Sequence, residues 1–312
     1  MMEPQTKTAT DLDEPHLPCP APVDFRAEAA AFEANANVGR WAGPRYSMTY
    51  RVLGQGPPLI LSPGIASTFR SYALTLNRLA ERFQTVVYDY PGENAGDKAR
   101  LGRISHDNLV EDLFGLIDHL NFGRVYLAGL SFGSTITLKA LHREPRRFPK
   151  AVVQGAFAHR DFTKAEIVAL WFGRRLPGRT ARLPLREAVL SYNSRLHFPE
   201  IIGDRWSYYV EQNGLTPIAS LAYRVDMVRK LDLRPILKEI RTEVLVLQGN
   251  EDRVVTRRSF DELCASLPNA HGVIMPMVGH QPHFTHGEGL AQAIIDWCLP
   301  CAPGGCPNGS DG

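Results

Sequence analysis

Long apolar runs are missing from this sequence of 312 residues. No run approaches the roughly 20 consecutive apolar residues that a membrane-spanning helix needs, which excludes a membrane-spanning protein. Residues 1–5 also lack the basic segment and the following apolar segment of a secretory signal peptide. We therefore expect a cytoplasmic protein that neither crosses a membrane nor is exported by that route.

Cysteine is scarce, and the odd number of five residues argues against a disulfide framework. Three of the five, Cys298, Cys301 and Cys306, lie close to the C-terminus. A structural zinc site needs four ligands at fixed spacing, and no second pair of ligands is near. We interpret the three as incidental thiols of a flexible tail, kept reduced inside the cell.

Neither sign of charge is in large excess, because 35 Lys and Arg residues stand against 33 Asp and Glu residues and the net charge is +2. That balance excludes the strongly basic surface that is typical of nucleic-acid-binding proteins. Motifs for a nucleotide or a metal ion are also missing, so we expect no cofactor and no metal. Hydrophobic residues make up 44% of the chain and charged residues 22%, as is ordinary for a globular protein with a core.

The sequence does contain a Gly-x-Ser-x-Gly motif, from Gly129 to Gly133 with Ser131 at its centre. It follows the apolar run 125–128 and precedes the helix-like segment 135–141. This order of strand, sharp turn and helix is the context of a nucleophile elbow, which exposes a serine hydroxyl to a base and to backbone N–H groups. The glycines lack a Cβ, so strand and helix can approach closely while the serine adopts an unfavourable backbone conformation.

Partners for Ser131 lie downstream, each after a buried strand. Asp252 is in the loop after the apolar run 243–247, and His280 follows the next run, 272–277. The order serine, acid, histidine is that of the enzymes that carry this elbow. We expect His280 to take the proton of the Ser131 hydroxyl and Asp252 to orient the imidazole.

Two other residues compete with Asp252 for the role of the acid. Glu251 is its neighbour, and Asp161 follows the preceding strand. We favour Asp252, because its offset from the end of its strand suits the elbow-bearing class.

Three histidines, His280, His283 and His286, are spaced three residues apart and could be read as metal ligands. That spacing drifts around a helix, and Pro282 interrupts it. We therefore expect no metal here and interpret His283 and His286 as surface or capping residues.

Four motifs stand in order at the ends of apolar runs. They are Ser62-Pro63-Gly64-Ile65, Asp89-Tyr90-Pro91-Gly92, the elbow, and Gly249-Asn250-Glu251-Asp252 together with Gly279-His280. In this order they resemble the α/β-hydrolase fold superfamily, as a cap-bearing member with a serine nucleophile, over about residues 45–299. The resemblance implies an α/β fold with a mostly parallel central sheet flanked by helices and a helical cap insertion. It also implies an oxyanion hole formed by the backbone N–H groups of Ile65 and Phe132.

Two positions depart from the family pattern. Pro63 stands where the family usually has a histidine, so the loop that carries Ile65 must be held by other contacts. After Gly92 the family commonly has a glycine and then a serine, whereas this chain has Glu93 and Asn94. Neither change removes a catalytic group, and asparagine tolerates the left-handed region that such a turn can require.

Residues 1–24 are acidic and rich in proline, and they predict a disordered leader. The hydrolase core is expected over residues 25–159 and 242–299, and a flexible tail over residues 300–312. Asp24 is placed to cap the first helix. Within the core we expect helices at 25–36, 69–82, 106–120 and 257–267, and strands at 46–53, 59–61, 86–88 and 151–155.

The remaining segment, residues 160–241, lacks a strand pattern and predicts a helical cap that governs the choice of substrate. Its 15 Lys and Arg residues exceed its nine Asp and Glu residues. This excess is either a solvated basic surface, which we favour, or a lid for an anionic substrate or an acyl-carrier partner. Trp171 and Phe172 are candidates to contact an acyl group or to pack on the core, and Arg174 and Arg175 are candidate substrate anchors.

The resemblance implies a serine hydrolase that cleaves a carboxylic ester, thioester or lactone of a small-molecule substrate. An acyltransferase would use the same residues while excluding water. A carbon–carbon bond hydrolase is a further alternative, although members of that kind usually carry a tryptophan after the histidine, where this chain has Gln281. A ligand sensor without turnover is the last alternative, and the oligomeric state stays open.

Overall fold

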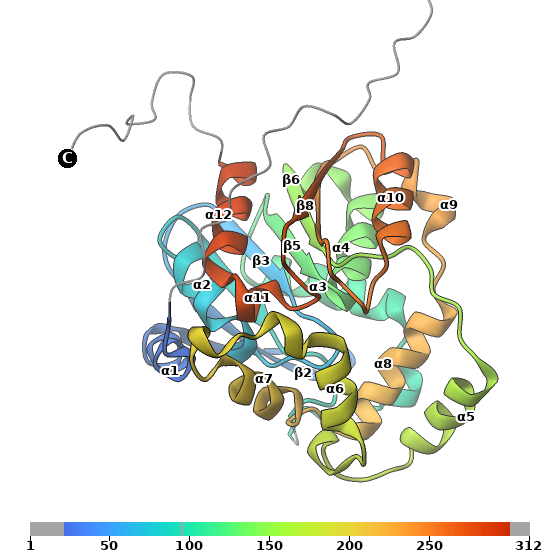
Figure 1. Ribbon diagram of the computed structural model, residues 1–312. Helices are drawn as coiled ribbons and strands as arrows, with labels where there is room; N and C mark the ends of the chain where they lie inside the picture. The colour runs from blue at the N-terminus through green and yellow to red at the C-terminus, as the bar shows by residue number, and fades with distance from the viewer. Residues whose placement is uncertain (1–21, 95, 300–312) are drawn as a thin grey trace, which may run out of the picture.

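The centre of the molecule is an eight-stranded, mostly parallel sheet (Figure 1). The structure is a computed structural model that describes residues 22–94 and 96–299. β2 pairs antiparallel with β1 and β4, and the other neighbours pair in parallel in the order β1-β2-β4-β3-β5-β6-β7-β8. The strands are β1 (Asn37–Ala42), β2 (Ser47–Leu53), β3 (Pro58–Ser62), β4 (Gln84–Tyr88), β5 (Tyr126–Leu130), β6 (Lys150–Gln154), β7 (Glu243–Gly249) and β8 (Ala270–Met275). The predicted sheet is confirmed.

Helices cover both faces of this sheet, which explains why its central strands are apolar at consecutive positions. In β3, Ile60 packs into one hydrophobic core while its neighbours Leu59 and Leu61 pack into the other. One core is covered by α3 (His106–His119), α4 (Phe132–Arg143) and α10 (Arg257–Ser266), and the other by α1 (Phe25–Asn35), α2 (Ala73–Leu79) and α12 (Gly287–Cys298) (Figure 1).

Capping side chains determine where two of these helices begin. At α3 the Ser105 hydroxyl accepts the N–H of Asn108, and the Asn108 side chain accepts the N–H of Ser105. Asp24 caps α1 as predicted, because its carboxylate accepts the N–H groups of Arg26 and Ala27. Helix α1 then packs against α2 and becomes part of the core.

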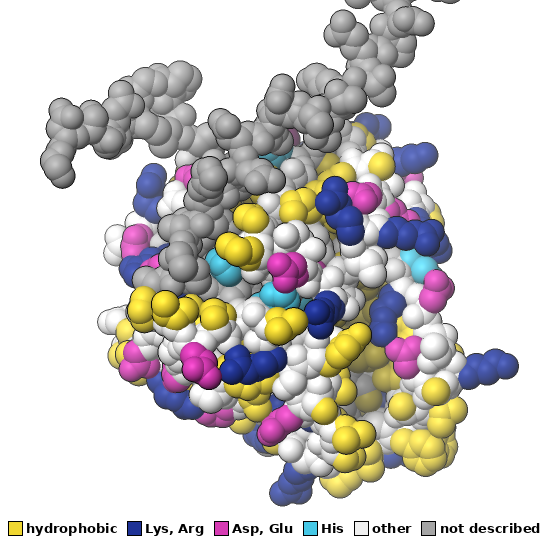
Figure 2. Space-filling model, viewed as in Figure 1, with side chains coloured by type: hydrophobic (Ala, Val, Ile, Leu, Met, Phe, Trp, Pro, Cys, Tyr) yellow, Lys and Arg dark blue, Asp and Glu magenta, His cyan; other side chains and the backbone are white. Residues whose placement is uncertain are grey.

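The segment predicted as a cap, residues 160–241, contributes no strand to the sheet among the described residues and is mostly helical (Figure 1). Its helices are α5 (Lys164–Gly173), α6 (Arg186–Ser194), α7 (Arg205–Asn213), α8 (Ile218–Lys230) and α9 (Arg234–Leu237). Helices α7 and α8 bury several side chains, whereas no residue of α5 is buried. Figure 2 shows apolar side chains at the lower right, over α5.

Some expectations about the elements need correction. Strand β1 was not predicted, because its residues alternate between exposed and half-buried positions and carry little apolar signal. The helix expected at 69–82 is shorter, since a 3-10 turn over Phe69–Tyr72 precedes α2. Cys298 is not part of a flexible tail but is buried in α12.

The leader and the tail cannot be compared with their predictions. Residues 1–21 and 300–312, including Cys301 and Cys306, lie outside the described residues. Within residues 22–94 and 96–299, no helix combines the length and the apolar character needed to cross a membrane.

Candidate active site

Ser131 occupies the sharp turn between β5 and α4, with φ of 52° and ψ of −114°. Such a conformation is costly for a residue with a Cβ, so surrounding contacts must hold it. The Ser131 N–H donates to the carbonyl oxygen of Gln154 in β6 at 2.8 Å. Gly133 lets the helix approach β3, because a Cβ there would lie 2.0 Å from the Ser62 carbonyl oxygen. The expected strand, turn and helix are therefore present around the serine.

The structure brings the two downstream candidates to this serine. His280 Nε2 lies 2.9 Å from Ser131 Oγ, and His280 Nδ1 lies 2.7 Å from Asp252 Oδ2. Asp252 follows β7 and His280 follows β8, so both stand at the carboxyl edge of the sheet, where β5 also ends. The imidazole therefore bridges the hydroxyl and the carboxylate with its two ring nitrogens.

Backbone donors fix the Asp252 carboxylate in this position. Its Oδ1 accepts the N–H groups of Val254 at 2.8 Å and Val255 at 2.9 Å. Burial raises the pKa of Asp252, but the charge of His280 and these hydrogen bonds outweigh it and hold the pKa below its usual value. The carboxylate consequently stays ionised beside the imidazole at neutral pH.

Room for the imidazole comes from Gly155, directly after β6. Its φ is +55°, and a Cβ at this position would lie 2.8 Å from His280 Cε1 and 3.6 Å from Asp252 Oδ2. Both the backbone conformation and the close approach require glycine. Sequence reasoning did not single out Gly155, although its place after a strand was visible.

The two competing acids lie elsewhere. The Asp161 side chain is fully exposed and its Oδ1 lies 3.2 Å from His159 Nε2. Glu251 is about half exposed, and its carboxylate lies 3.5 Å from His197 Nδ1. Among the described residues, neither of them forms a hydrogen bond with His280. Asp252 is therefore the acid that the geometry pairs with the histidine.

Two tyrosines hold the loop in which Pro63 replaces the usual histidine. The Tyr90 hydroxyl donates to the Pro63 carbonyl oxygen at 2.9 Å, and the Gly64 N–H donates to the Tyr72 oxygen at 2.6 Å. Burial raises the pKa of Tyr72 to about 12 and that of Tyr90 well above its usual value, so both phenols stay protonated. These contacts hold the loop in place of the histidine that the family usually has at position 63.

A buried arginine of the predicted cap holds the next residue of this loop. Arg224 in α8 is 1% exposed, donates to the Ile65 carbonyl oxygen and pairs with Glu93. Ile65 is one candidate oxyanion donor, and the other, Phe132, is the first residue of α4, where N–H groups have no acceptor within the helix. Sequence reasoning missed Tyr72, Tyr90 and Arg224, because only the substitution at Pro63 signalled that some contact was needed.

A cavity of about 170 Å³ opens at Ser131 and contains the histidine and the Ile65 loop. Its polar lining carries no Asp, Glu, Lys or Arg side chain. Besides Ser131 and His280, the polar side chains that line it are Ser67, Tyr72, Gln154, Asn193, Ser194, Tyr209, Asn213, Gln281 and His283. We call this space the serine cavity.

The four substrate-site candidates of residues 171–175 do not line the serine cavity. Trp171 and Phe172 are 47% and 55% exposed on α5. Arg175 lies over the Trp171 ring, 3.9 Å from its centroid, and donates to the Trp171 carbonyl oxygen. Arg174 lines a different cavity. None of the four is therefore part of the substrate site at Ser131 that the structure suggests.

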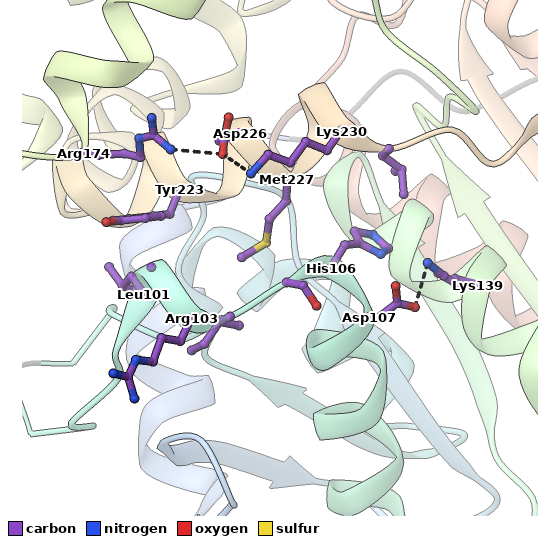
Figure 3. A pocket seen from close by; sticks show the side chains of 14 residues that line it. Leu101, Arg103, His106, Asp107, Lys139, Arg174, Tyr223, Asp226, Met227 and Lys230 are labelled. Carbon is purple, nitrogen blue, oxygen red and sulfur yellow. Dashed lines mark hydrogen bonds and ion pairs between the residues drawn. The ribbon is translucent and has the colours of Figure 1, made fainter.

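That second cavity, which we call the charged cavity, lies between the start of α3 and α8 and has a volume of about 370 Å³ (Figure 3). It shares no lining residue with the serine cavity. Figure 3 shows Lys139 meeting Asp107, and Arg174 and Lys230 meeting Asp226, with N–O distances of 2.7, 3.2 and 2.7 Å. Each of these three cations is thus paired with a carboxylate, although Arg174 and Lys230 share the one of Asp226.

The two histidines downstream of His280 were predicted as surface or capping residues. His286 does stand at the N-cap position of α12, although its side chain makes no capping hydrogen bond. His283 differs from the prediction, because it is 3% exposed and packs against Tyr72 with ring centroids 4.5 Å apart. The sequence could not show this, because Tyr72 is far away in the chain. Within the described residues, no three or more His, Cys, Asp or Glu side chains are grouped so that they could hold a metal ion.

Known proteins resemble this chain over most of its length. A relative named "Putative carbamate hydrolase RutD" from Serratia proteamaculans is 26% identical over 263 residues, which cover 81% of this chain and 96% of the relative. A 2-(acetamidomethylene)succinate hydrolase from Mesorhizobium japonicum is 25% identical and covers 81% of this chain and 92% of the relative.

Solved structures agree on the fold. A thermophilic esterase from Thermogutta terrifontis superposes with a TM-score of 0.73 at 19% identity, covering 84% of this chain and 98% of the esterase. An enol-lactonase from Burkholderia xenovorans LB400 gives 0.71 at 19% identity, covering 83% and 99%. The model of the family described as the alpha/beta hydrolase fold matches residues 57–287, which include the elbow and both of its partners. The chain therefore belongs to the alpha/beta hydrolase fold family.

Proposed function

We propose that this chain is a serine hydrolase that cleaves a carboxylic ester, thioester or lactone of a small molecule through an acyl-enzyme intermediate. The observation that supports it best is the pair of hydrogen bonds that link Ser131 to His280 at 2.9 Å and His280 to Asp252 at 2.7 Å. Both distances are within the reach needed for a base to activate a nucleophile and for an acid to orient that base.

In the acylation step, Ser131 Oγ bonds to the acyl carbon while its proton passes to His280 Nε2. The negative charge on the former carbonyl oxygen is met by the N–H groups of Ile65 and Phe132. His280 then gives the proton to the leaving oxygen as the carbon–oxygen bond breaks. Asp252 stabilises the imidazolium that exists between the two transfers.

Deacylation repeats these transfers with water. Water adds to the acyl carbon and gives a proton to His280, and the proton returns to Ser131 Oγ as the acyl-serine bond breaks. The products are a carboxylic acid and the regenerated hydroxyl. An acyltransferase would differ only in the acceptor, so added alcohols or amines that yield new esters or amides would identify it.

A second candidate substrate class is a carbamate or another acyl compound that carries an amide group. One observation favours it, namely the names of the two relatives. Carbamate cleavage by the same residues would release a carbamic acid in place of a carboxylic acid.

We place the enzyme in the cytoplasm. Cys264 and Cys298 are free thiols, which supports a reducing compartment.

The test is the hydrolysis of p-nitrophenyl esters from acetate to palmitate by the wild type and by Ser131→Ala. We expect turnover by the wild type and a loss of at least 10⁴-fold in kcat in the variant, since removal of the nucleophile leaves only binding and oxyanion contacts. Equal rates in the two proteins would contradict the proposal. A p-nitrophenyl carbamate assayed in parallel examines the second candidate class.

A further inference from the structure

Helix α5 of the predicted cap turns large apolar side chains to solvent. Ile167, Val168, Trp171 and Phe172 are between 41% and 55% exposed, and Leu176 just beyond the helix is also exposed. These are five of the 13 large apolar side chains that are exposed in the described residues, and they lie within ten positions. Single exposed apolar side chains are ordinary on a protein surface, whereas a group of them marks an interaction surface.

Four of these side chains share one face of the helix. Positions 167, 168, 171 and 172 lie together because residues three or four apart are neighbours on an α-helix. The rings of Trp171 and Phe172 also contact each other, with centroids 4.8 Å apart. The opposite side of the helix faces α8, where a Cβ on Gly173 would lie 3.1 Å from the Ala222 Cβ. Helix α5 thus packs on the protein through its other side and presents the apolar face at the edge of the molecule (Figure 1).

A cation stands at each end of this apolar face. Lys164 lies one turn before Val168, and Arg175 lies one turn after Trp171. Both are exposed, and the Arg175 guanidinium lies over the Trp171 ring, 3.9 Å from its centroid. Neither forms an ion pair with a carboxylate in the part of the chain that the structure describes, where the pairs of this segment are those of Arg160 and Arg174. The two positive charges therefore stay available to an anionic partner.

Size and charge together indicate what covers this face. Five apolar side chains are few, since a stable protein–protein interface takes about 20–30 residues from each side. Residues 160–182 contain six Lys or Arg and two Asp or Glu, so a second copy would bring positive charge against positive charge. A lipid bilayer with anionic headgroups, in contrast, accepts Trp and Phe rings at its interface and attracts the cations beside them.

We propose that α5 docks on the surface of an anionic phospholipid bilayer. Trp171 and Phe172 insert among the headgroups, and Lys164 and Arg175 lie beside the lipid phosphates. One short helix gives a peripheral and reversible contact. The proposal does not depend on the proposed hydrolase function, because none of these four residues lines the serine cavity.

Co-sedimentation of the full chain with lipid vesicles tests this docking. One set of vesicles contains phosphatidylcholine alone, and the other contains equal amounts of phosphatidylcholine and phosphatidylglycerol. We expect binding to the anionic vesicles to be at least about tenfold tighter and to weaken in high salt, because salt screens the attraction between the cations and the lipid. Equal binding to both sets, or binding to neither, would overturn the proposal.

Variants separate docking through the apolar face from general attraction by charge. Trp171→Gln combined with Phe172→Gln should weaken binding to the anionic vesicles at least about tenfold, since the rings supply the apolar contact. Val38→Thr combined with Met277→Gln is the matched control, because these side chains are 65% and 72% exposed but lie outside α5. The control should bind like the wild type. If the variant without the two aromatic rings also bound like the wild type, α5 would not be the docking element.

The two cations should contribute as well. Lys164→Gln and Arg175→Gln should each weaken binding to the anionic vesicles about fivefold. Because all the altered side chains are exposed, urea unfolding of each variant should match that of the wild type. Loss of binding together with a lowered unfolding midpoint would mean that the variant had damaged the fold, and the fluorescence of the wild type then decides the question.

Tryptophan emission of the wild type should shift to shorter wavelengths when anionic vesicles are added, because the Trp171 ring leaves water. Bromine-labelled lipids should quench that emission. No shift and no quenching would contradict insertion of the ring. Sedimentation equilibrium without lipid examines the other occupant: a wild-type dimer that Trp171→Gln converts to a monomer would overturn the proposal, because a second copy would then cover this face.

Discussion

The serine cavity and the charged cavity differ in the charge of the side chains that line them. In the charged cavity, Lys139 is paired with Asp107, and Arg174 and Lys230 are paired with Asp226. The smaller serine cavity has no Asp, Glu, Lys or Arg side chain in its lining.

The comparison teaches that an excess of basic residues in a segment does not by itself locate the reacting residues. The basic excess of residues 160–241 suggested an anion site, with Arg174 as an anchor. The carboxylate of Asp226 pairs with that arginine and also with Arg229 and Lys230, so one negative charge meets three positive charges. The charged cavity therefore keeps an excess of positive charge, but none of its lining residues lines the serine cavity.

The largest effect on kcat is expected from Asp252→Asn, next to the serine cavity. The amide cannot stabilise the imidazolium and favours the wrong tautomer of His280, so kcat should fall about 10⁴-fold. Glu251→Gln, one residue away and half exposed, should change kcat less than about threefold. Rates of ester hydrolysis measure both, and similar losses in the two variants would show that Asp252 is not the acid.

The second largest effect is expected at Gly155, which leaves room for the His280 ring. Gly155→Ala places a Cβ 2.8 Å from the imidazole and strains a φ of +55°, so we expect about a 10²-fold loss of kcat/KM and a loss of 1–3 kcal/mol of stability. Gly123→Ala is the control, since nothing lies within 4 Å of the added Cβ. A Gly155→Ala enzyme with wild-type kinetics would mean that the histidine works in another position.

Acid stability provides a comparison in which the two cavities should behave alike. Burial lowers the pKa of His283 in the serine cavity to about 3 and, together with the charge of Lys139, that of His106 in the charged cavity to about 4. The unfolded histidines take up a proton near pH 6.5 while the folded ones stay neutral. Stability is therefore full above that pH and falls by about 1.4 kcal/mol per pH unit for each histidine until the folded pKa is reached.

Urea unfolding between pH 7 and pH 4.5 measures this slope. His106→Gln and His283→Gln should each make it shallower, because each removes one of the two buried imidazoles. A slope that neither variant changes would show that the buried imidazoles are not the groups that titrate.

The smallest effect is expected in the charged cavity. The Lys230 side chain is 63% exposed, and exposed ion pairs contribute at most about 1 kcal/mol. Lys230→Gln should therefore leave kcat/KM within about twofold and the unfolding free energy nearly unchanged. A tenfold loss of activity would contradict this distinction between the two cavities, because it would mean that the charged cavity contributes to the reaction.

The fold and the three candidate residues could be predicted because their signals are local. The central strands are short apolar runs, and Ser131, Asp252 and His280 lie one, three and five residues after the ends of β5, β7 and β8. Parallel strands then bring these loops to one edge of the sheet.

Contacts between distant segments could not be predicted in this way. His283 is buried because its ring packs against Tyr72. The residues next to His283 in the sequence give no indication of that contact. Strand β1 could not be predicted for a different reason. It is a half-solvated edge strand, and such a strand needs few apolar residues. The placement of Arg174 depended on Asp226, fifty-two positions later in the chain.

Arg224 joins α8 of the predicted cap to the loop that carries Ile65. This contact means that the insertion and the core are not interchangeable modules. A chimera whose new segment has no arginine at this place would lose the donor to the Ile65 carbonyl, and we expect it to lose activity on every substrate. Engineering a new substrate range in this protein should therefore begin with single substitutions in the serine cavity and leave α8 in place.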